Sequence, residues 1–201
     1  MNTSQLIRHT KPLLGATAAL CALLNSPAVA LPGILDTAVN PGNNHVYYLL
    51  ANSNWTDAQS AAVGIGGNLA TVNDLAENNW VWNLWGTNRN LWIGLHDPII
   101  GDGTGATHAA NFVWADGDAS AFRNWRAGEP NNGNTGEYDA YILGKGLSGG
   151  GQWNDGPDVT ATGGQFSQFG VVEVVPEPSA GLLLAGGMLT AFGARRMRSR
   201  R

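Results

Sequence analysis

The chain contains one cysteine, Cys21, and this residue lies inside a segment with the features of a secretory signal. Arg8 and Lys11 precede the apolar run PLLGATAALCALL, and the small residues AVA follow it. A charged start, an apolar middle and a small-residue exit, in this order, are typical of a cleaved export signal and disfavour a buried N-terminal helix. We therefore expect residues 1–30 to be removed, so that an exported domain must fold from Leu31 onward without a disulfide.

An exported domain without disulfides depends on its apolar core or on a bound metal. Seven of the eight tryptophans lie between Trp80 and Trp153, and they offer a large apolar area for such a core. Between Leu31 and Val175 there are four basic and fourteen acidic residues, which gives a net charge of −10. This charge disfavours nucleic acid as a partner and favours the attraction of hard cations.

A three-part tail occupies residues 176–201. Pro176, Glu177 and Pro178 precede an apolar run over residues 180–194, and five arginines follow within seven residues. As a helix, these 15 apolar residues would span about 22 Å, short of a hydrocarbon core of about 30 Å. The tail resembles the PEP-CTERM sorting signal of Gram-negative bacteria. The resemblance implies an exosortase-like processing enzyme as a partner and transient anchoring in the inner membrane, with the basic end cytoplasmic; an ordinary membrane anchor is the alternative.

Residues 46–175 carry two helical patterns and several short apolar runs. Polar residues able to cap the helices precede each of them: Asn54 or Thr56 for the first, and Asn73 or Asp74 for the second. The extended runs are VYYLLA, NLATV, LWIGL, NFVWADG, YDAYIL and FGVVEVV. Two helices, short and mostly antiparallel strands and long loops predict an α+β fold. Residues 31–45 have turn residues but no periodicity, so we expect an irregular leader segment there.

A polar stretch, GEPNNGNTGEYDAYI, contains few residues that can pack in a core. It supplies Glu129, Asn131 and Glu137, and the downstream run WND supplies Asn154 and Asp155. Carboxylate and amide oxygens are the hard ligands that Ca²⁺ prefers, and the ion takes about six to eight of them. The set contains neither cysteine nor histidine, which disfavours a transition metal. These side chains therefore predict most of a calcium site.

The same side chains can bind sugar hydroxyls. A hydroxyl can contact a cation, accept one hydrogen bond and donate another at the same time. A carboxylate provides the acceptor and an asparagine amide provides the donor, so Glu129 and Asn131 form one suitable pair. Glu137 and Asn154 form a second, and the two pairs can hold a vicinal diol whose oxygens also contact the ion. Carbohydrate is therefore the expected partner, and the metal would belong to the binding surface.

Five motifs occur in an order and spacing that together are specific: GGNLATV, WIGL, FVWADG, NWRAGEPNN and WND. They make the region 46–175 resemble a C-type lectin-like domain. The resemblance implies that the five side chains named above bind calcium at the sugar site. It also implies mannose- or glucose-type sugars, which accompany the EPN form of Glu129, Pro130 and Asn131, and a cis peptide bond before Pro130. Trp153 is expected in the core under this loop, so that Trp153 and Pro130 shape it.

The sequence departs from this family at its disulfide positions. The resemblance implies that Ala62 and Val172 replace one pair of half-cystines, and both residues can still pack in a core. Asp139 and Asp158 replace the second pair, so two acids stand where a bridge would clamp the binding loop. Without that clamp we expect weak calcium binding, as in extracellular modules with dissociation constants of about 10⁻⁴ to 10⁻³ M.

Other interpretations are a plain turn, a binding module without sugar recognition, and an enzyme. Glu129 and Asn131 alone would suit an ordinary turn around a proline. A structural or protein-binding adhesion module of the extracellular matrix, braced by calcium, is the main alternative because a fold does not fix a function. We expect no enzyme, since neither a Ser-His-Asp arrangement nor a glycosidase pair of acids can be identified. His108 has no spacing to other histidines that favours a shared metal, and residues 96–110 predict a glycine-rich loop.

Overall fold

The computed structural model describes residues 32–101, 106–133, 136–159 and 166–176. The predicted signal at residues 1–30 lies outside the described residues, as does the predicted sorting tail from Glu177 onward, including Pro178. Within the described ranges, no helix combines the length and the apolar character needed to cross a membrane.

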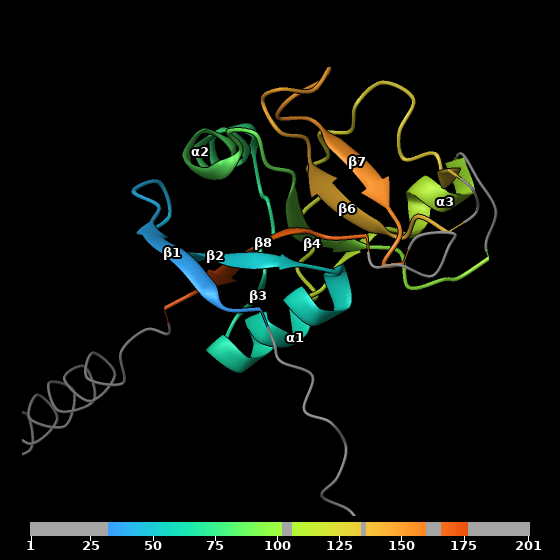
Figure 1. Cartoon of the computed structure of the whole chain (residues 1–201). Helices are drawn as coiled ribbons and strands as arrows, with labels where there is room; N and C mark the ends of the chain where they lie inside the picture. Colours follow the sequence, from blue (N-terminus) through green and yellow to red (C-terminus); the bar gives the residue numbers. More distant parts are fainter. Residues whose placement is uncertain (1–31, 102–105, 134–135, 160–165, 177–201) are drawn as a thin grey trace, which may run out of the picture. The chain divides into compact units, whose positions relative to one another are not determined.

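A sheet of short strands forms the centre of the domain (Figure 1). Its strands are β1 (Ile34–Val39), β2 (Val46–Ser53), β3 (Asn68–Leu69), β4 (Leu91–His96), β5 (Val113–Trp114), β6 (Asp139–Ile142), β7 (Trp153–Gly156) and β8 (Gln168–Val174). The main path runs β1-β2-β8-β4-β6-β7, while β3 pairs with β8 and β5 pairs with β4. The pair β4 and β8 is parallel, and the other pairs are antiparallel. The predicted α+β class with short, mostly antiparallel strands is confirmed.

The described helices are α1 (Trp55–Ile65), α2 (Leu75–Trp85) and α3 (Ala106–Asn111). Asn54 caps α1, because its side-chain oxygen accepts a hydrogen bond from the Asp57 amide at 2.8 Å. Asp74 caps α2 in the same way, with a distance of 2.9 Å to the Glu77 amide. Gly66 follows α1 with a φ of 92°, a left-handed conformation that costs glycine little. Both predicted helices therefore begin at one of their two expected capping residues.

Two segments differ from the sequence prediction. The segment 31–45, expected as an irregular leader, contributes β1, which pairs with β2 at the edge of the sheet. The side chains of β1 are largely exposed, so the strand lacks the apolar alternation by which half-buried strands are identified. The segment 96–110, expected as a loop, contains most of α3. This third helix has only six residues, which are too few to display a helical period.

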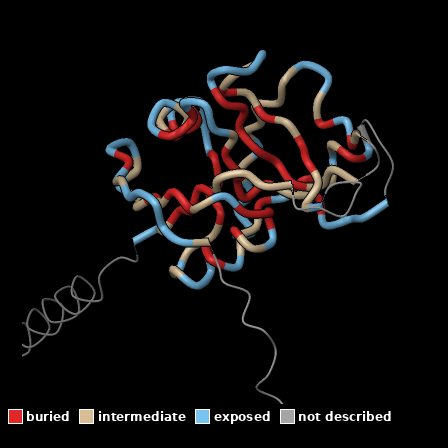
Figure 2. Tube along the Cα trace, in the orientation of Figure 1, coloured by how far each residue is buried: buried red, intermediate tan, exposed pale blue. Residues whose placement is uncertain are grey.

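Buried apolar side chains form two clusters, and Figure 2 shows the buried chain concentrated within the sheet and the inner faces of the helices. One cluster includes the fully buried Trp153. The other joins α1 to β8 through Ala62 and Val172, which are both fully buried. These two residues stand at the positions where the resemblance implies half-cystines. Apolar packing therefore links α1 to β8 there, as the sequence predicted.

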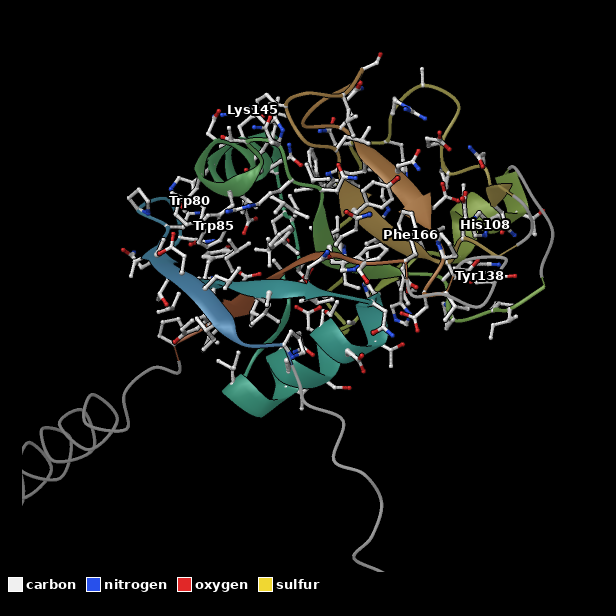
Figure 3. The ribbon with its side chains drawn as sticks, in the orientation of Figure 1. Trp80, Trp85, His108, Tyr138, Lys145 and Phe166 are labelled. Atoms are coloured by element: carbon white, nitrogen blue, oxygen red, sulfur yellow. The ribbon has the colours of Figure 1, made fainter. Side chains whose placement is uncertain are left out.

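The tryptophans of α2 attach this helix to the edge of the sheet. Trp80 lies edge-to-face against Tyr47 of β2, with ring centroids 5.1 Å apart. Trp85 donates a hydrogen bond from Nε1 to Oδ2 of Asp36 in β1, at 2.9 Å. Figure 3 shows both indoles between α2 and the edge formed by β1. The strand that sequence analysis missed thus holds part of α2 in place.

Asn78 joins α2 to the buried Trp153. The fully buried Asn78 side chain accepts a hydrogen bond from Trp153 Nε1 at 2.7 Å. We predict that Asn78→Ala lowers the free energy of unfolding by about 1–3 kcal/mol, because the buried indole N–H loses this partner. The matched change Asn79→Ala, on the exposed side of the same helix, should alter it by less than about 0.5 kcal/mol. Urea denaturation measures both, and equal effects would contradict this role for Asn78.

Candidate binding site at the long loop

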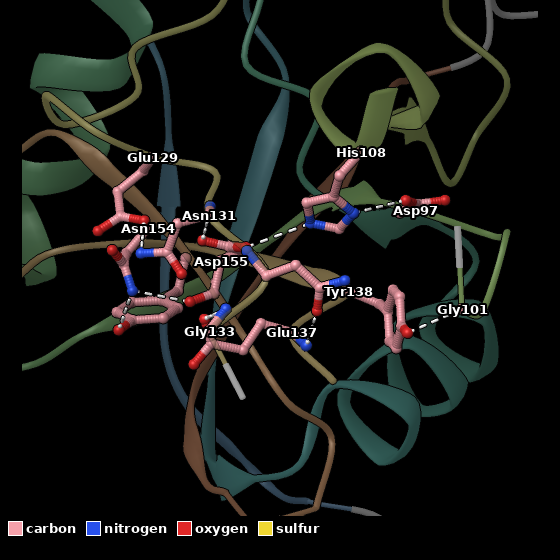
Figure 4. Close-up of polar contacts among 12 residues, drawn as sticks. Asp97, Gly101, His108, Glu129, Asn131, Gly133, Glu137, Tyr138, Asn154 and Asp155 are labelled. Atoms are coloured by element: carbon pink, nitrogen blue, oxygen red, sulfur yellow. Dashed lines mark hydrogen bonds and ion pairs between the residues drawn. The ribbon is translucent and has the colours of Figure 1, made fainter. Parts of the chain in front are cut away.

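The long loop before β6 and the strand β7 bring the predicted site residues into one region (Figure 4). Glu129, Asn131 and Glu137 lie on the loop that enters β6. β7 pairs with β6 so that Asp155 stands opposite Ala140, and Asn154 is the neighbouring residue on the strand. Figure 4 shows all five predicted oxygen ligands within this region. The sheet register therefore joins two stretches that are far apart in the sequence.

Asp155 fixes the first part of the loop. Its carboxylate is fully buried and accepts hydrogen bonds from two consecutive backbone amides. Oδ1 accepts from the Asn131 amide at 3.2 Å, and Oδ2 accepts from the Asn132 amide at 2.7 Å. A carboxylate that accepts backbone N–H groups in a buried place forms strong, charge-assisted bonds. Asp155 therefore attaches the loop to β7.

The backbone of the loop bends sharply at its start. The Glu129–Pro130 peptide bond is cis, as the resemblance implied, and Pro130 is buried. Asn132 follows with a φ of 50°, in the left-handed region that asparagine tolerates better than most residues. Trp153 is fully buried beside the loop and packs against Trp125, with ring centroids 5.8 Å apart. Trp153 thus lies in the core, and the role of Trp153 and Pro130 in shaping the loop stays a prediction.

Two side-chain oxygens face the same small space above Gly133. A Cβ placed on Gly133 would lie 2.8 Å from Glu137 Oε2 and 2.9 Å from Asn131 Oδ1. Glu137 Oε2 also accepts a hydrogen bond from the Gly133 amide at 2.7 Å. Any larger residue at this position would displace these oxygens. The glycine therefore keeps open the space into which both oxygens point.

The two predicted donor-acceptor pairs differ in this structure. Asn131 Nδ2 donates a hydrogen bond to Glu129 Oε2, so the first pair is in direct contact. Asn154 Nδ2 instead donates to the hydroxyl of Tyr141 at 2.9 Å and to the Asp155 carbonyl at 2.7 Å. For Asn154 to bind a sugar hydroxyl, its amide must leave these partners.

Arg126 enters the site and was not identified from the sequence. Its guanidinium Nη2 donates to Glu129 Oε1 at 2.6 Å and to Asn154 Oδ1 at 3.3 Å. A fixed positive charge thus contacts two of the five predicted ligands. Arg126 lies three residues before Glu129, and this spacing was the only signal in the sequence that could have indicated the contact.

Burial and neighbouring charge act together on Glu137. Burial, with smaller effects from the charges of Asp155 and Glu129, raises the pKa of Glu137 from its ordinary value of 4.5 to about 7. The Gly133 amide and His108 oppose this rise without cancelling it. The Glu137 carboxylate is therefore less favoured in its charged form than an exposed glutamate would be.

His108 supports Asp155 from α3, although sequence analysis assigned it no role. The ring is fully buried, with Nδ1 2.8 Å from Asp97 Oδ2 and Nε2 3.2 Å from Asp155 Oδ2. Figure 4 shows it between the two carboxylates, and Figure 3 shows it beside Tyr138. An imidazolium donates from both nitrogens, whereas a neutral ring donates from one. His108 was missed because short-range spacing does not reveal a partner 47 residues away.

The acidic side chains alone do not form a metal cage. Among the residues that the structure describes, no three His, Cys, Asp or Glu side chains come together closely enough to hold an ion. The three carboxylates of the site are interleaved with the amides of Asn131 and Asn154. Any cation bound here would therefore need amide as well as carboxylate oxygens.

The acids at the second pair of expected half-cystine positions lie close to each other. Burial raises the pKa of Asp139 well above its ordinary range, and the charge of Asp158 adds to this effect. Asp158 itself accepts hydrogen bonds from the Thr56 amide at 3.0 Å and from the Thr56 hydroxyl at 2.8 Å. The chain after β7 is thereby attached to the first turn of α1.

Comparison with known proteins identifies the family of this chain. The family model described as Lectin C-type domain matches residues 51–162, which include the long loop and β7. The chain belongs to the C-type lectin domain family. Solved structures of the family agree with the fold. The C-type lectin CEL-I from Cucumaria echinata is 25% identical, with a TM-score of 0.54 over 70% of this chain and 95% of that chain.

Several relatives of this C-type lectin domain have names or titles that state a carbohydrate. The mannose-binding isoform of C-type lectin from Oxyuranus scutellatus is 32% identical over 126 residues, covering 58% of this chain and 72% of the relative. The cow CD23 carbohydrate-recognition domain, crystallised with a GlcNAc2Man3 oligosaccharide, is 26% identical, with a TM-score of 0.51 over 66% of this chain and 88% of that chain. An alpha-N-acetylgalactosamine-specific lectin from Patiria pectinifera is 33% identical over 98 residues, covering 46% of this chain and 52% of the relative. The names or titles of these three relatives thus state different carbohydrates.

Glu137 makes the stability of the calcium-free domain depend on pH. The folded chain holds this proton up to about pH 7, whereas an exposed glutamate loses it near 4.5. The folded state therefore binds more protons than the unfolded state in this window, so we predict that stability falls as pH rises from about 5 to 7. In chelator, Glu137→Gln should remove part of this fall. Urea denaturation across this range measures the difference between the two proteins.

The matched control for this change is Asp118→Asn, which alters an exposed acid outside the site. The free energy of unfolding of this variant should vary with pH in the same way as that of the unchanged protein. A Glu137→Gln variant with an unaltered pH dependence would contradict the assignment to Glu137.

Proposed function

We propose that this chain is an exported, calcium-dependent carbohydrate-binding protein. Its ligands would be mannose- or glucose-type sugars, whose vicinal equatorial hydroxyls are held at the long loop, in an extracellular or cell-surface polysaccharide. The observation that carries the proposal is the gathering of Glu129, Asn131, Glu137, Asn154 and Asp155 around one loop. Membership of the C-type lectin domain family supports it.

The donor set of this loop fits a hard cation. All five side chains offer oxygen, and Ca²⁺ prefers carboxylate and carbonyl oxygens over nitrogen or sulfur. Glu137 Oε2 and Asn131 Oδ1 border one small space. Burial is the main cause of the raised pKa of Glu137, and the charges of Asp155 and Glu129 add to it; a divalent cation bound here would favour the ionised carboxylate. When bound, calcium would supply positive charge and coordination positions for two adjacent sugar hydroxyls.

The side chains themselves would provide the hydrogen bonds that select the sugar. Glu129 accepts and Asn131 donates, and their present contact places a donor and an acceptor next to each other. Glu137 accepts at the second hydroxyl. Asn154 would donate there once its amide leaves the Tyr141 hydroxyl. The resemblance associates the EPN form of Glu129, Pro130 and Asn131 with mannose- or glucose-type sugars, which is why we propose these rather than galactose-type sugars.

The terminal segments support an exported location. The charged start, apolar run and AVA exit of residues 1–30 favour secretion. The tail from Pro176 onward favours processing by an exosortase-like enzyme after transient anchoring in the inner membrane. The protein would then act at the cell surface or in the extracellular matrix. We propose no enzymatic activity.

A structural or protein-binding module is the second candidate. Arg126 and His108 both contribute hydrogen bonds that hold the loop residues without a bound ion. A calcium-independent type II antifreeze protein has the same fold, with a TM-score of 0.53 over 71% of this chain and 96% of that chain, at 18% identity. That likeness concerns the fold alone. The retention experiment below distinguishes this candidate from a lectin.

Retention of the full chain on immobilised mannan tests the proposed function. We expect binding in millimolar calcium, release by chelator and elution by free mannose, but not by galactose. Asp155→Asn should weaken retention at least about tenfold, because a charged ligand and an anchor of the loop are altered together. Asp118→Asn, an exposed acid outside the loop, is the matched control and should bind normally. Retention that survives chelator, or no retention of any glycan in millimolar calcium, would defeat the lectin proposal.

Removal of Arg126 should strengthen calcium binding. Its guanidinium engages oxygens of Glu129 and Asn154 and adds a positive charge beside the proposed ion. We therefore predict that Arg126→Gln tightens calcium binding by about threefold or more, most clearly at low salt. Calorimetric calcium titration measures this change. Lys145→Gln removes the same charge elsewhere and should have little effect; weaker binding in Arg126→Gln would mean that Arg126 supports the ligands and does not compete.

A further inference from the structure

A hollow lies beyond the last residue of β6, whereas the long loop with the proposed calcium ligands lies before its first residue. The hollow lies between the end of β2, the turn before β4, the loop after β6 and the start of β8. Its volume is about 350 Å³. This is within the range of about 300–1,000 Å³ that is typical of ligand pockets. The hollow is therefore large enough for a sugar residue.

Arg89 provides a positive charge in this hollow. Its guanidinium lies over the ring of Phe169, 5.0 Å from the centroid. Among the described residues, no carboxylate forms an ion pair with it. Asp36 receives hydrogen bonds from Trp85 and Thr37, which lower its pKa more than the charge of Arg89 does. The Arg89 guanidinium thus keeps its hydrogen-bond donors available while Phe169 restrains its position.

The rest of the lining is rich in amides and contains no acid. Asn52, Asn90 and Gln168 contribute amide groups from three separate segments, and none of the described lining residues is acidic. Asn90 Oδ1 accepts a hydrogen bond from the Gly144 amide at 2.9 Å, which orients the side chain and leaves its NH₂ group for a ligand. In a domain with many more acids than bases, an acid-free hollow around an arginine is suited to an anion with hydroxyl groups.

We propose that this hollow binds a carboxylated sugar, such as the uronic acid residue of an acidic glycan, without any metal. The guanidinium of Arg89 would take the carboxylate in a two-point contact. The amides of Asn52, Asn90 and Gln168 would bind ring hydroxyls, and the half-exposed Leu147 would cover part of the apolar ring face. The proposal goes beyond the calcium-dependent function, because it concerns other residues and needs no ion.

Binding of D-glucuronate to the full chain in chelator tests this site, because chelator prevents calcium-dependent sugar binding at the long loop. We expect saturable binding in NMR titrations, with shifts at Arg89 and Phe169, and no comparable binding of D-glucose or inorganic phosphate. Arg89→Gln should weaken glucuronate binding about tenfold or more, since a charge-assisted contact is lost. Lys145→Gln removes an equal charge from the same loop region, where the ammonium lies over Trp82. This control should change affinity by less than about threefold.

A second variant fills the hollow without altering its charge. A Cβ on Gly146 would meet only Asn88 Oδ1, at 3.8 Å, so the backbone accepts a larger residue there. We expect Gly146→Phe to abolish glucuronate binding while circular dichroism and calcium-dependent mannan retention stay unchanged. Absence of glucuronate binding, equal binding of glucose, stronger binding of phosphate, or normal binding in both variants would each overturn the proposal. Loss of mannan retention by the unchanged protein would contradict the proposed calcium-dependent function, but it would not bear on glucuronate binding in chelator.

Discussion

The buried carboxylate of Asp155 is the contact on which the candidate site depends. It accepts the amides of Asn131 and Asn132 and faces His108, so one side chain joins the long loop, β7 and α3. These bonds are shielded from water, since the Asp155 side chain is fully buried, and such charge-assisted contacts are stronger than exposed ones. The remaining predicted ligands take their places from this attachment. Asn131 is one of the two attached residues, and Glu129 lies two residues before it. Glu137 then accepts a hydrogen bond from the Gly133 amide, which follows the attached residues.

Local signals in the sequence were sufficient for α1 and α2, but not for the short helix α3. Asn54 and Asp74 could be identified as caps of α1 and α2, because each cap binds a backbone amide only three residues further along the chain. Contacts between distant segments were not accessible in this way. His108 meets Asp155 only after the sheet forms, and β1 shows no alternation because its side chains remain exposed. The five oxygen ligands were predicted from chemistry and resemblance, whereas the contacts of Arg126 and His108 required the tertiary structure.

Two different solutions replace the expected disulfides. Ala62 and Val172 keep α1 on β8 by apolar packing, which is non-directional and tolerates small displacements. At the other position, Asp139 is buried with a raised pKa near Asp158, and Asp158 bonds to Thr56 at the start of α1. The chain after β7 is thus connected to α1 by directional hydrogen bonds, so α1 is held by apolar packing on β8 and by polar contacts at its first turn.

The order of strands separates the edge with the proposed binding loop from the last described strand, β8. β8 ends at Val174, just before the predicted sorting tail, and β4 and β6 lie between it and β7. At about 4.8 Å per strand, this places β7 about 14 Å across the sheet from β8. If the tail is attached or released as proposed, the change would therefore act on the domain through β8, with β4 and β6 between it and the strand beside the proposed binding loop.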